Sequence, residues 1–351
     1  MTLPSHRLLA RWAATLALAA IGGALAARIG APLPWMLGAL AATGLAAAAG
    51  LRPLGEPIAF PQRLRIAFIP VIGVLIGGAA TPGLLAAAPG WWPAIVATLA
   101  FVGLAHGGNF LLLRRAGLDK PTAFFAGMPG GLIESIELGE KAGAEPRTLT
   151  LLQFARIAIT VSTVPLVFSL IEGRAVGSAA GESIATAAPL SAWDAAVLVA
   201  CGVVGLFGAR ALKAPAAQIT GPIVVSALAH LSGLTEASPP QWLASVAQVV
   251  IGASLGVRFA GADRALLRRC LALSALSVGF MLGLAGLFAL ALDAIGVAPP
   301  AASVLALSPG GVVEMGLVAL SLQASPIYVT LMHIVRILAT VWFAVWLWRR
   351  V

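Results

Sequence analysis

Charge is scarce in this sequence: only 10% of its 351 residues are charged, while 60% are hydrophobic and the mean hydropathy is +0.99. A water-soluble domain carries about 25% charged residues. The polar residues here are too few to cover a water-facing surface, which excludes an ordinary soluble domain. We therefore expect an all-α integral membrane protein.

Cysteine is also nearly absent. Cys201 and Cys270 lie in apolar segments and neither has a C-x-x-C neighbour, so the sequence predicts neither a disulfide framework nor a thiolate metal site. The four histidines are scattered along the chain: His6, His106, His230 and His333. We expect no cofactor, no metal and no enzymatic activity.

The basic residues give a net charge of +9 but form no soluble module. They occur in short runs between apolar segments, a pattern typical of the positive-inside rule rather than of nucleic-acid binding. The partners that we expect are a lipid bilayer and a small solute, with no direct contact to nucleic acid.

Long apolar stretches are abundant. A transmembrane helix needs about 20 apolar residues, and ten segments approach this length: 9–27, 34–51, 66–80, 92–113, 149–171, 194–212, 217–234, 241–259, 270–292 and 327–348. The first could instead be a signal peptide with a small-residue cleavage site at Ala24-Leu25-Ala26. We favour an uncleaved span, because it has a counterpart in the second half.

An internal repeat covers most of the chain. Residues 129–134 read Pro-Gly-Gly-Leu-Ile-Glu and residues 309–314 read Pro-Gly-Gly-Val-Val-Glu. The register continues, since Arg156 falls on Arg336. Such self-similarity is typical of a duplicated transporter-like core. The predicted domains are a first repeat over 1–171, a polar and glycine-rich linker over 172–192, and a second repeat over 193–351.

The basic residues also predict the topology. If each Pro-Gly-Gly segment is re-entrant, each half crosses five times and the second half is inverted. Eighteen of the 22 lysines and arginines then lie on the cytoplasmic side with both termini, and only Arg28 and Arg174 lie outside. If the segments cross instead, the basic clusters of the second half move outside, which the positive-inside rule disfavours. We therefore predict about ten transmembrane helices as two inverted five-helix repeats, each with a re-entrant or broken Pro-Gly-Gly helical hairpin, in a bacterial inner membrane.

The Pro-Gly-Gly segments are the centre of the candidate site. Proline removes a backbone donor and paired glycines let the chain turn, so free helix N-termini could face a cavity and bind an anion. A packing kink without a ligand is the alternative. The candidate substrate-binding residues are Pro129, Gly130, Gly131, Glu134, Arg156, Pro309, Gly310, Gly311, Glu314 and Arg336.

Carboxylates and arginines at membrane depth are costly and usually mark function. Glu134 and Glu314 could contribute to such a site, or they could cap their own helix N-termini. Arg156 and Arg336 could pair with the glutamate of the same repeat, or they could grip a carboxylate or phosphate bidentately.

His333 replaces Gln153 of the first repeat. Histidine titrates near neutral pH, so His333 is a candidate for proton coupling. A neutral histidine hydrogen-bonded in the core is the alternative, and Na⁺ is the other coupling ion considered. The oligomeric state stays open, with a homo-oligomer among the options.

Several of these motifs resemble those of one family. They are Met-Pro-Gly-Gly-Leu-Ile-Glu at 128–134, Leu-Gly-Glu at 138–140, Pro146, Gln-Phe-Ala-Arg at 153–156 and Pro-Trp-Met-Leu-Gly at 34–38. This set resembles the AbrB-type membrane protein family, named for a membrane AbrB duplication, over essentially the full chain. It does not resemble the small soluble DNA-binding AbrB regulators.

The resemblance implies two labels that family members carry: regulator of gene expression and ammonia monooxygenase. A copper or iron monooxygenase needs clustered ligands, and a DNA-binding regulator needs a module outside the membrane, which the short loops do not provide. By fold, the family looks like ten-span inverted-repeat carriers such as bile-acid symporters and cation/proton antiporters. We expect a secondary transporter or exporter of a small anionic or zwitterionic solute. A membrane-embedded regulator that acts indirectly on gene expression is the alternative.

Overall fold

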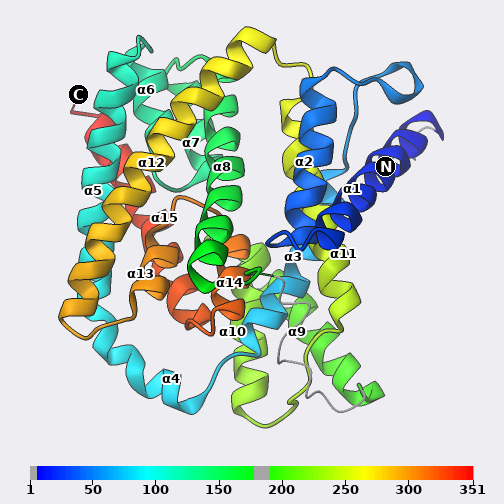
Figure 1. The fold of residues 1–351 in the computed structure, drawn as a ribbon. Helices are drawn as coiled ribbons and strands as arrows, with labels where there is room; N and C mark the ends of the chain where they lie inside the picture. Colours follow the sequence, from blue (N-terminus) through cyan, green and yellow to red (C-terminus); the bar gives the residue numbers. More distant parts are fainter. Residues whose placement is uncertain (1–5, 178–189, 351) are drawn as a thin grey trace. The chain divides into compact units, whose positions relative to one another are not determined.

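The described part of the protein is entirely helical. The computed structural model describes residues 6–177 and 190–350, and this part contains no strand (Figure 1). Seven helical segments are long and apolar enough to cross a membrane: His6–Arg28, Ala88–Arg115, Pro146–Glu172, Ala192–Ala211, Gln241–Phe259, Arg264–Ala294 and Pro326–Trp348. The predicted all-α membrane protein is confirmed at this level.

Three of the ten predicted spans fall on shorter helices. They are α2 (Pro34–Ala48), α3 (Gln62–Gly77) and α10 (Ala217–Leu231), with 15 or 16 residues each. Such a helix rises only about 22–24 Å, which is less than the bilayer core of about 30 Å. Helix length therefore supports seven spans, and the count of ten remains a prediction.

The chain divides into two compact units. Unit 1 comprises Met1–Ala80 and Pro165–Leu267, and unit 2 comprises Thr81–Val164 and Arg268–Val351. Each unit therefore takes residues from both halves of the sequence. The predicted repeats, 1–171 and 193–351, are defined by sequence similarity. The division into compact units does not test them. Residues 178–189 of the predicted linker 172–192 lie outside the described residues.

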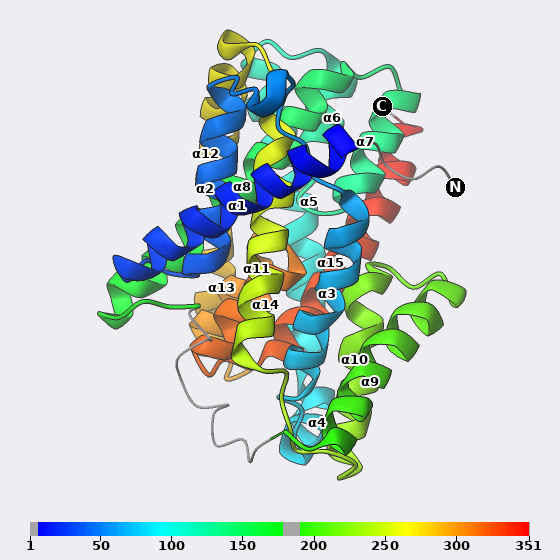
Figure 2. The ribbon, with the colours of Figure 1, turned by 90° about the vertical axis from the view of Figure 1, so that its right-hand side faces the viewer.

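Unit 1 is built from helices that approach one another through glycines. Its helices are α1 (His6–Arg28), α2, α3, α9 (Ala192–Ala211), α10 and α11 (Gln241–Gly256) (Figure 2). Gly22 of α1 faces Gly38 of α2, and Gly205 of α9 faces Gly221 of α10. A Cβ on Gly38 would lie 2.2 Å from the Gly22 carbonyl oxygen, and one on Gly221 would lie 1.9 Å from that of Gly205. The backbones therefore touch, as small residues allow between membrane helices.

A second pair of glycine contacts links the two sequence halves within unit 1. A Cβ on Gly73 of α3 would lie 2.9 Å from the Ile219 carbonyl oxygen of α10. A Cβ on Gly252 of α11 would lie 2.3 Å from the Met36 carbonyl oxygen of α2. In unit 1, α3 from the first half of the sequence therefore packs on α10 from the second half. Likewise, α11 from the second half packs on α2 from the first half.

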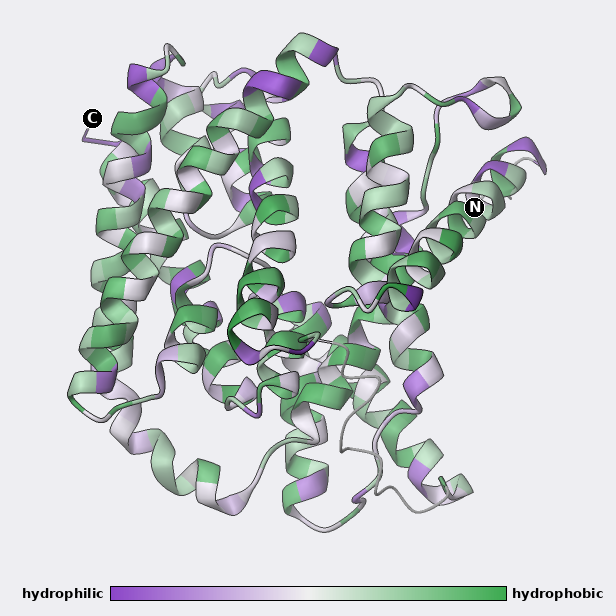
Figure 3. Cartoon of the chain, viewed as in Figure 1, coloured by the Kyte–Doolittle hydropathy of each residue, from purple (hydrophilic) through white to green (hydrophobic). Residues whose placement is uncertain are grey.

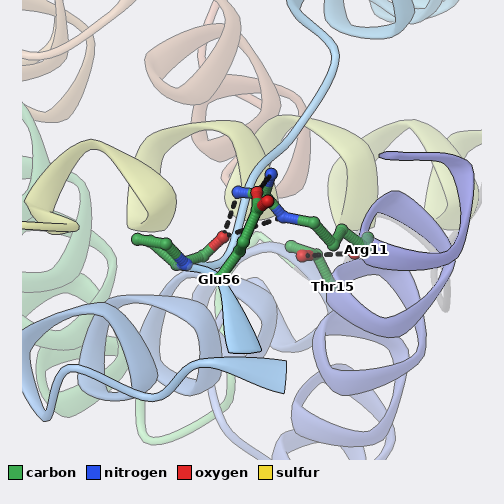
Figure 4. Close-up of polar contacts among 4 residues, drawn as sticks. Arg11, Thr15 and Glu56 are labelled. Atoms are coloured by element: carbon green, nitrogen blue, oxygen red, sulfur yellow. Dashed lines mark hydrogen bonds and ion pairs between the residues drawn. The ribbon is translucent and has the colours of Figure 1, made fainter. Parts of the chain in front are cut away.

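Polar residues are concentrated near helix ends, while most of the helix surface is apolar (Figure 3). One polar contact fixes α1 to the loop after α2: the Arg11 guanidinium forms an ion pair with Glu56 and donates to the Pro57 carbonyl (Figure 4). Glu56 is exposed, so this pair contributes little to stability.

Unit 2 holds both Pro-Gly-Gly segments. Its further helices are α4 (Pro82–Ala87), α5 (Trp92–Arg115), α6 (Lys120–Ala126), α7 (Leu132–Lys141), α13 (Pro300–Leu307), α14 (Val312–Ser321) and α15 (Pro326–Trp348). Two helices cross the unit boundary and lie mostly in unit 2: α8 (Pro146–Glu172) and α12 (Arg264–Ala294). Short 3₁₀ turns at Pro53–Gly55, Ala88–Trp91 and Val257–Phe259 complete the described helices.

Candidate functional site

The first Pro-Gly-Gly segment is the tip of a short helical hairpin. α6 ends at Ala126 and α7 begins at Leu132, so the helix is interrupted over 127–131. The far ends of the two arms lie together, because the Glu145 amide donates to Thr122 Oγ1 at 2.8 Å. This end of unit 2 is also where α5 ends and α8 begins (Figure 1). We call residues 120–141 hairpin 1.

The second segment has the same local design. α13 ends at Leu307 and α14 begins at Val312, with Ser-Pro-Gly-Gly between them. We call residues 300–321 hairpin 2. Proline and glycine explain both breaks, because proline supplies no amide donor and glycine adopts turn conformations that other residues resist.

Each hairpin is held by the arginine that follows it. Arg156 of α8 donates from Nη1 to the Met128 carbonyl of hairpin 1. Arg336 of α15 donates from Nη1 to the Ser308 carbonyl and from Nη2 to the Gly310 carbonyl, the latter at 3.0 Å. Both side chains are buried, with 4% and 2% exposure. These carbonyls end the first arm of each hairpin, where a helix presents its negative pole, so a cation there is stabilising.

The two copies differ one turn before the arginine. Gln153 donates from Nε2 to the Phe125 carbonyl at 2.8 Å, which adds a second hydrogen bond to the end of α6. His333 makes no such bond, because its Nδ1 lies 2.9 Å from the Val329 carbonyl of its own helix. If His333 is neutral, Nδ1 carries the proton and Nε2 is a buried acceptor without a partner.

The two glutamates lie over the starts of their own helices. A Cβ on Gly311 would lie 1.9 Å from Glu314 Oε2, and one on Gly131 would lie 3.4 Å from Glu134 Oε2. Each carboxylate therefore sits at the positive N-terminal pole of α7 or α14, where it is stabilising. Of the two roles left open by the sequence, this geometry fits helix-end compensation.

The arginines of both hairpins bind the backbone. Arg156 and Arg336 donate to the carbonyls at the ends of the first arms. Each interrupted hairpin thus has a cation at the end of its first arm and an anion at the start of its second.

Two threonines that the sequence analysis missed complete the centre of unit 2. A Cβ on Gly130 would lie 3.3 Å from Thr340 Oγ1 of α15, and one on Gly310 would lie 3.2 Å from Thr160 Cγ2 of α8. Each hairpin tip therefore touches the helix whose arginine holds the other hairpin. The sequence does contain a signal for these threonines, since each one follows its arginine by four residues in the repeated pattern Arg-Ile-x-x-Thr.

Unused hydrogen-bonding groups gather around these tips. Nε of both arginines and Oγ1 of both threonines are buried without a partner. Buried polar groups normally find partners, and exceptions call for an explanation. In the described residues, no group of three or more His, Cys, Asp or Glu side chains could hold a metal ion.

The chain is similar to known proteins over most of its length. The family described as "Transition state regulatory protein AbrB" matches residues 45–351. "Uncharacterized protein YhjN" of Bacillus subtilis (strain 168) is 26% identical over 93% of this chain and 89% of its own length. "Putative regulator AbrB" of Escherichia coli (strain K12) is 24% identical over 62% of this chain and 61% of its own. The resemblance inferred from the motifs is confirmed: the chain belongs to the AbrB family of membrane proteins.

Proposed function

We propose that this protein is a secondary transporter of a small anionic solute, with its binding site in the hairpin region of unit 2. The proposal keeps the predicted topology of ten crossings in two inverted repeats, with both hairpins re-entrant. It also keeps the predicted location in a bacterial inner membrane with cytoplasmic termini. The asymmetric distribution of basic residues supports this orientation.

The observation that carries the proposal is the pair of buried arginines. A permanently charged guanidinium is costly at membrane depth and is seldom retained without a role. Carbonyl contacts use only part of each guanidinium, because the Nε donors have no partner. Interrupted helices near the midplane, with free ends turned to the solute, are the usual binding elements of inverted-repeat carriers.

The proposal is tested by solute flux in proteoliposomes that contain the purified full-length chain. Radiolabelled acetate, lactate, succinate and phosphate are offered in turn under a proton gradient and under a Na⁺ gradient. We expect one class of anion to accumulate. Arg336→Lys should reduce its flux at least about tenfold, whereas the exposed Arg28→Gln should leave it unchanged. Flux that is equal in all three proteins would remove Arg336 from the site.

A second candidate function follows from the comparisons. The matching family is described as regulatory, and one relative is named a regulator. A membrane-embedded regulator would act indirectly, through a cytosolic partner that recognises the basic loops. A partner that co-purifies at one copy per chain, together with no flux of any offered solute, would favour this function.

A further inference from the structure

We propose that the two copies of the motif are not equivalent: hairpin 1 and α15 bind the carboxylate group of the solute, while hairpin 2 is a structural brace. The inference rests on the proposed transport function and deepens it. It assigns one oxyanion site per chain, at Gly130, Arg336 Nε and Thr340 Oγ1, and it names carboxylates as the solute class.

The first tip brings two unused donors to one point. A Cβ on Gly130 would lie 3.3 Å from Thr340 Oγ1 and 3.7 Å from Arg336 Nε, so both atoms face the same glycine. Thr340 is fully buried and Arg336 is 2% exposed, and neither of these atoms has a partner. Two converging donors, one of them charged, match the two oxygens of a carboxylate.

Arg336 is suited to this role because it links the two hairpins. Its Nη atoms bind the Ser308 and Gly310 carbonyls of hairpin 2, and its Nε lies beside Gly130 of hairpin 1. The guanidinium plane is therefore fixed before any solute arrives. Preorganised donors lose little entropy on binding.

The hydroxyl of Thr340 is one of three buried threonine hydroxyls without a partner in the described residues, with those of Thr160 and Thr330. Thr43 and Thr98 donate to the carbonyl four residues earlier, at 2.7 Å in each case. That local bond is the usual arrangement for a threonine inside a helix. Thr340 has no such bond, so its hydroxyl remains available to a ligand.

The start of α7 adds a third element at this tip. α7 has ten residues, and its N-cap, Gly131, has no side chain with which to cap the first amides. A carboxylate at Gly130 would lie at this positive helix end. Glu134 occupies the same end and is only half-buried, so displacement of its carboxylate by the solute requires little rearrangement.

The second tip lacks this arrangement. The atom of Thr160 that faces Gly310 is the methyl Cγ2, at 3.2 Å from the Cβ position, and the closest atom is Met315 Cε at 3.0 Å. Glu314 is 2% exposed and lies over Gly311. The nearest atoms at the second tip are therefore apolar, and a buried carboxylate already lies at the start of α14.

A Cβ at Gly130 would already lie 3.3 Å from Thr340 Oγ1, so a carboxylate enters only when the tip of hairpin 1 withdraws from α15. Glycine at this position keeps the two elements in contact without a side chain between them. Such a movement of one element against another is what alternating access requires.

The test compares matched threonine variants of the full-length chain in detergent. Thermal stabilisation by acetate, lactate, succinate, phosphate and chloride is measured at constant ionic strength, and an apparent Kd is taken from the concentration dependence. Thr340→Val removes the hydroxyl and keeps the shape. Thr160→Val is its counterpart, and Thr98→Val controls for loss of a buried hydroxyl. Gly130→Ala and Gly310→Ala form a second pair.

We expect carboxylates to stabilise the wild-type protein, Thr98→Val and Thr160→Val with similar apparent Kd. Thr340→Val should weaken binding by about tenfold, the size expected for one lost hydrogen bond to a charged group. Gly130→Ala should weaken it more than Gly310→Ala. Equal losses in Thr160→Val and Thr340→Val, or none in either, would overturn the inference.

The same variants separate this inference from the transport function. If Thr340→Val transports a carboxylate with unchanged affinity, the site is elsewhere and transport still holds. If the wild-type protein neither binds nor transports any of the offered anions, the proposed function itself is refuted.

Discussion

Hairpin 1 and hairpin 2 carry the same motif, but their surroundings differ. Glu134 is half-buried, whereas Glu314 is 2% exposed and all of Val312–Ala319 is buried. Gly131 has a φ of +65°, whereas the equivalent Gly311 is extended with a φ of −85°. The comparison shows that Pro-Gly-Gly determines where the helix breaks, while the surroundings determine the shape of the turn.

The second arms explain part of this difference. The exposed Glu137, Glu140 and Lys141 of α7 are replaced by Leu317, Leu320 and Ser321 in α14. Charged side chains keep α7 near water, and apolar ones let α14 become buried. Hairpin 1 is therefore the hairpin with the more exposed second arm.

The arginines should show the largest difference between the hairpins. Arg336→Ala leaves two carbonyls without their donor, and Arg156→Ala leaves one. Each unpaired buried carbonyl costs about 1–3 kcal/mol. We expect Arg336→Ala to lower the thermal unfolding midpoint about twice as far as Arg156→Ala, and the exposed Arg28→Ala to leave it unchanged. A larger effect of Arg156→Ala would reverse our assignment of hairpin 2 as the brace.

Substitution of the tip glycines by alanine should destabilise the two hairpins for different reasons. Gly131→Ala places alanine at a positive φ, at a cost of about 1–2 kcal/mol. Gly311→Ala instead drives a Cβ into the Glu314 carboxylate. We therefore expect Glu314→Ala to recover part of the stability lost in Gly311→Ala, while Glu134→Ala recovers none in Gly131→Ala. Double-mutant cycles by thermal unfolding measure this, and equal coupling in both cycles would contradict the distinction.

The residue one turn before each arginine should have a smaller effect. Gln153→Leu loses the bond to the Phe125 carbonyl, worth about 1 kcal/mol. His333→Gln should leave the stability unchanged or raise it, because a glutamine at this position is long enough to form the kind of bond that Gln153 forms. Unfolding midpoints test the stabilities. Flux measured from pH 5 to 8 tests proton coupling, since loss of the pH dependence in His333→Gln would assign that role to His333.

The smallest expected difference in stability concerns the N-terminal caps of α8 and α15, the helices that follow the hairpins. Glu145 accepts from the Arg147 and Thr148 amides at 3.1 and 2.5 Å, and Ser325 accepts from the Tyr328 amide at 3.2 Å. Desolvation is the largest single influence and raises the pKa of Glu145, but hydrogen bonds from Thr148 and Arg147 and the charge of Arg147 together outweigh it and bring the pKa below its usual value of 4.5. The stability that this carboxylate contributes is therefore present above pH 4.5 and is lost as the pH falls through the lower pKa of the folded state.

Glu145→Gln should remove that acid-sensitive contribution, which is about 0.5–1 kcal/mol for a helix cap. Ser325→Ala should cost a similar amount at every pH, because a hydroxyl does not titrate in this range. Unfolding midpoints between pH 3 and pH 7 check the pair. A pH dependence that persists unchanged in Glu145→Gln would show that it comes from another group.

Much of the architecture could be predicted from local chemistry. The breaks at Pro129 and Pro309, and the membrane class itself, follow from composition and backbone properties that act within a few residues. The partners of the arginines could not be predicted in this way. A pairing with Glu134 or Glu314 was as plausible as a solute, and the structure has each arginine on carbonyls 26–28 residues earlier.

The sequence by itself determined that this is a helical membrane protein with two interrupted, charge-bearing hairpins, because hydrophobicity, proline and glycine act locally. Only the tertiary structure decided that Thr340 and Arg336 Nε meet at Gly130 while Thr160 turns a methyl group to Gly310. It also decided that each compact unit draws on both halves of the chain. Such contacts depend on the packing of segments far apart in sequence, where a rotation of one helix exchanges a hydroxyl for a methyl group.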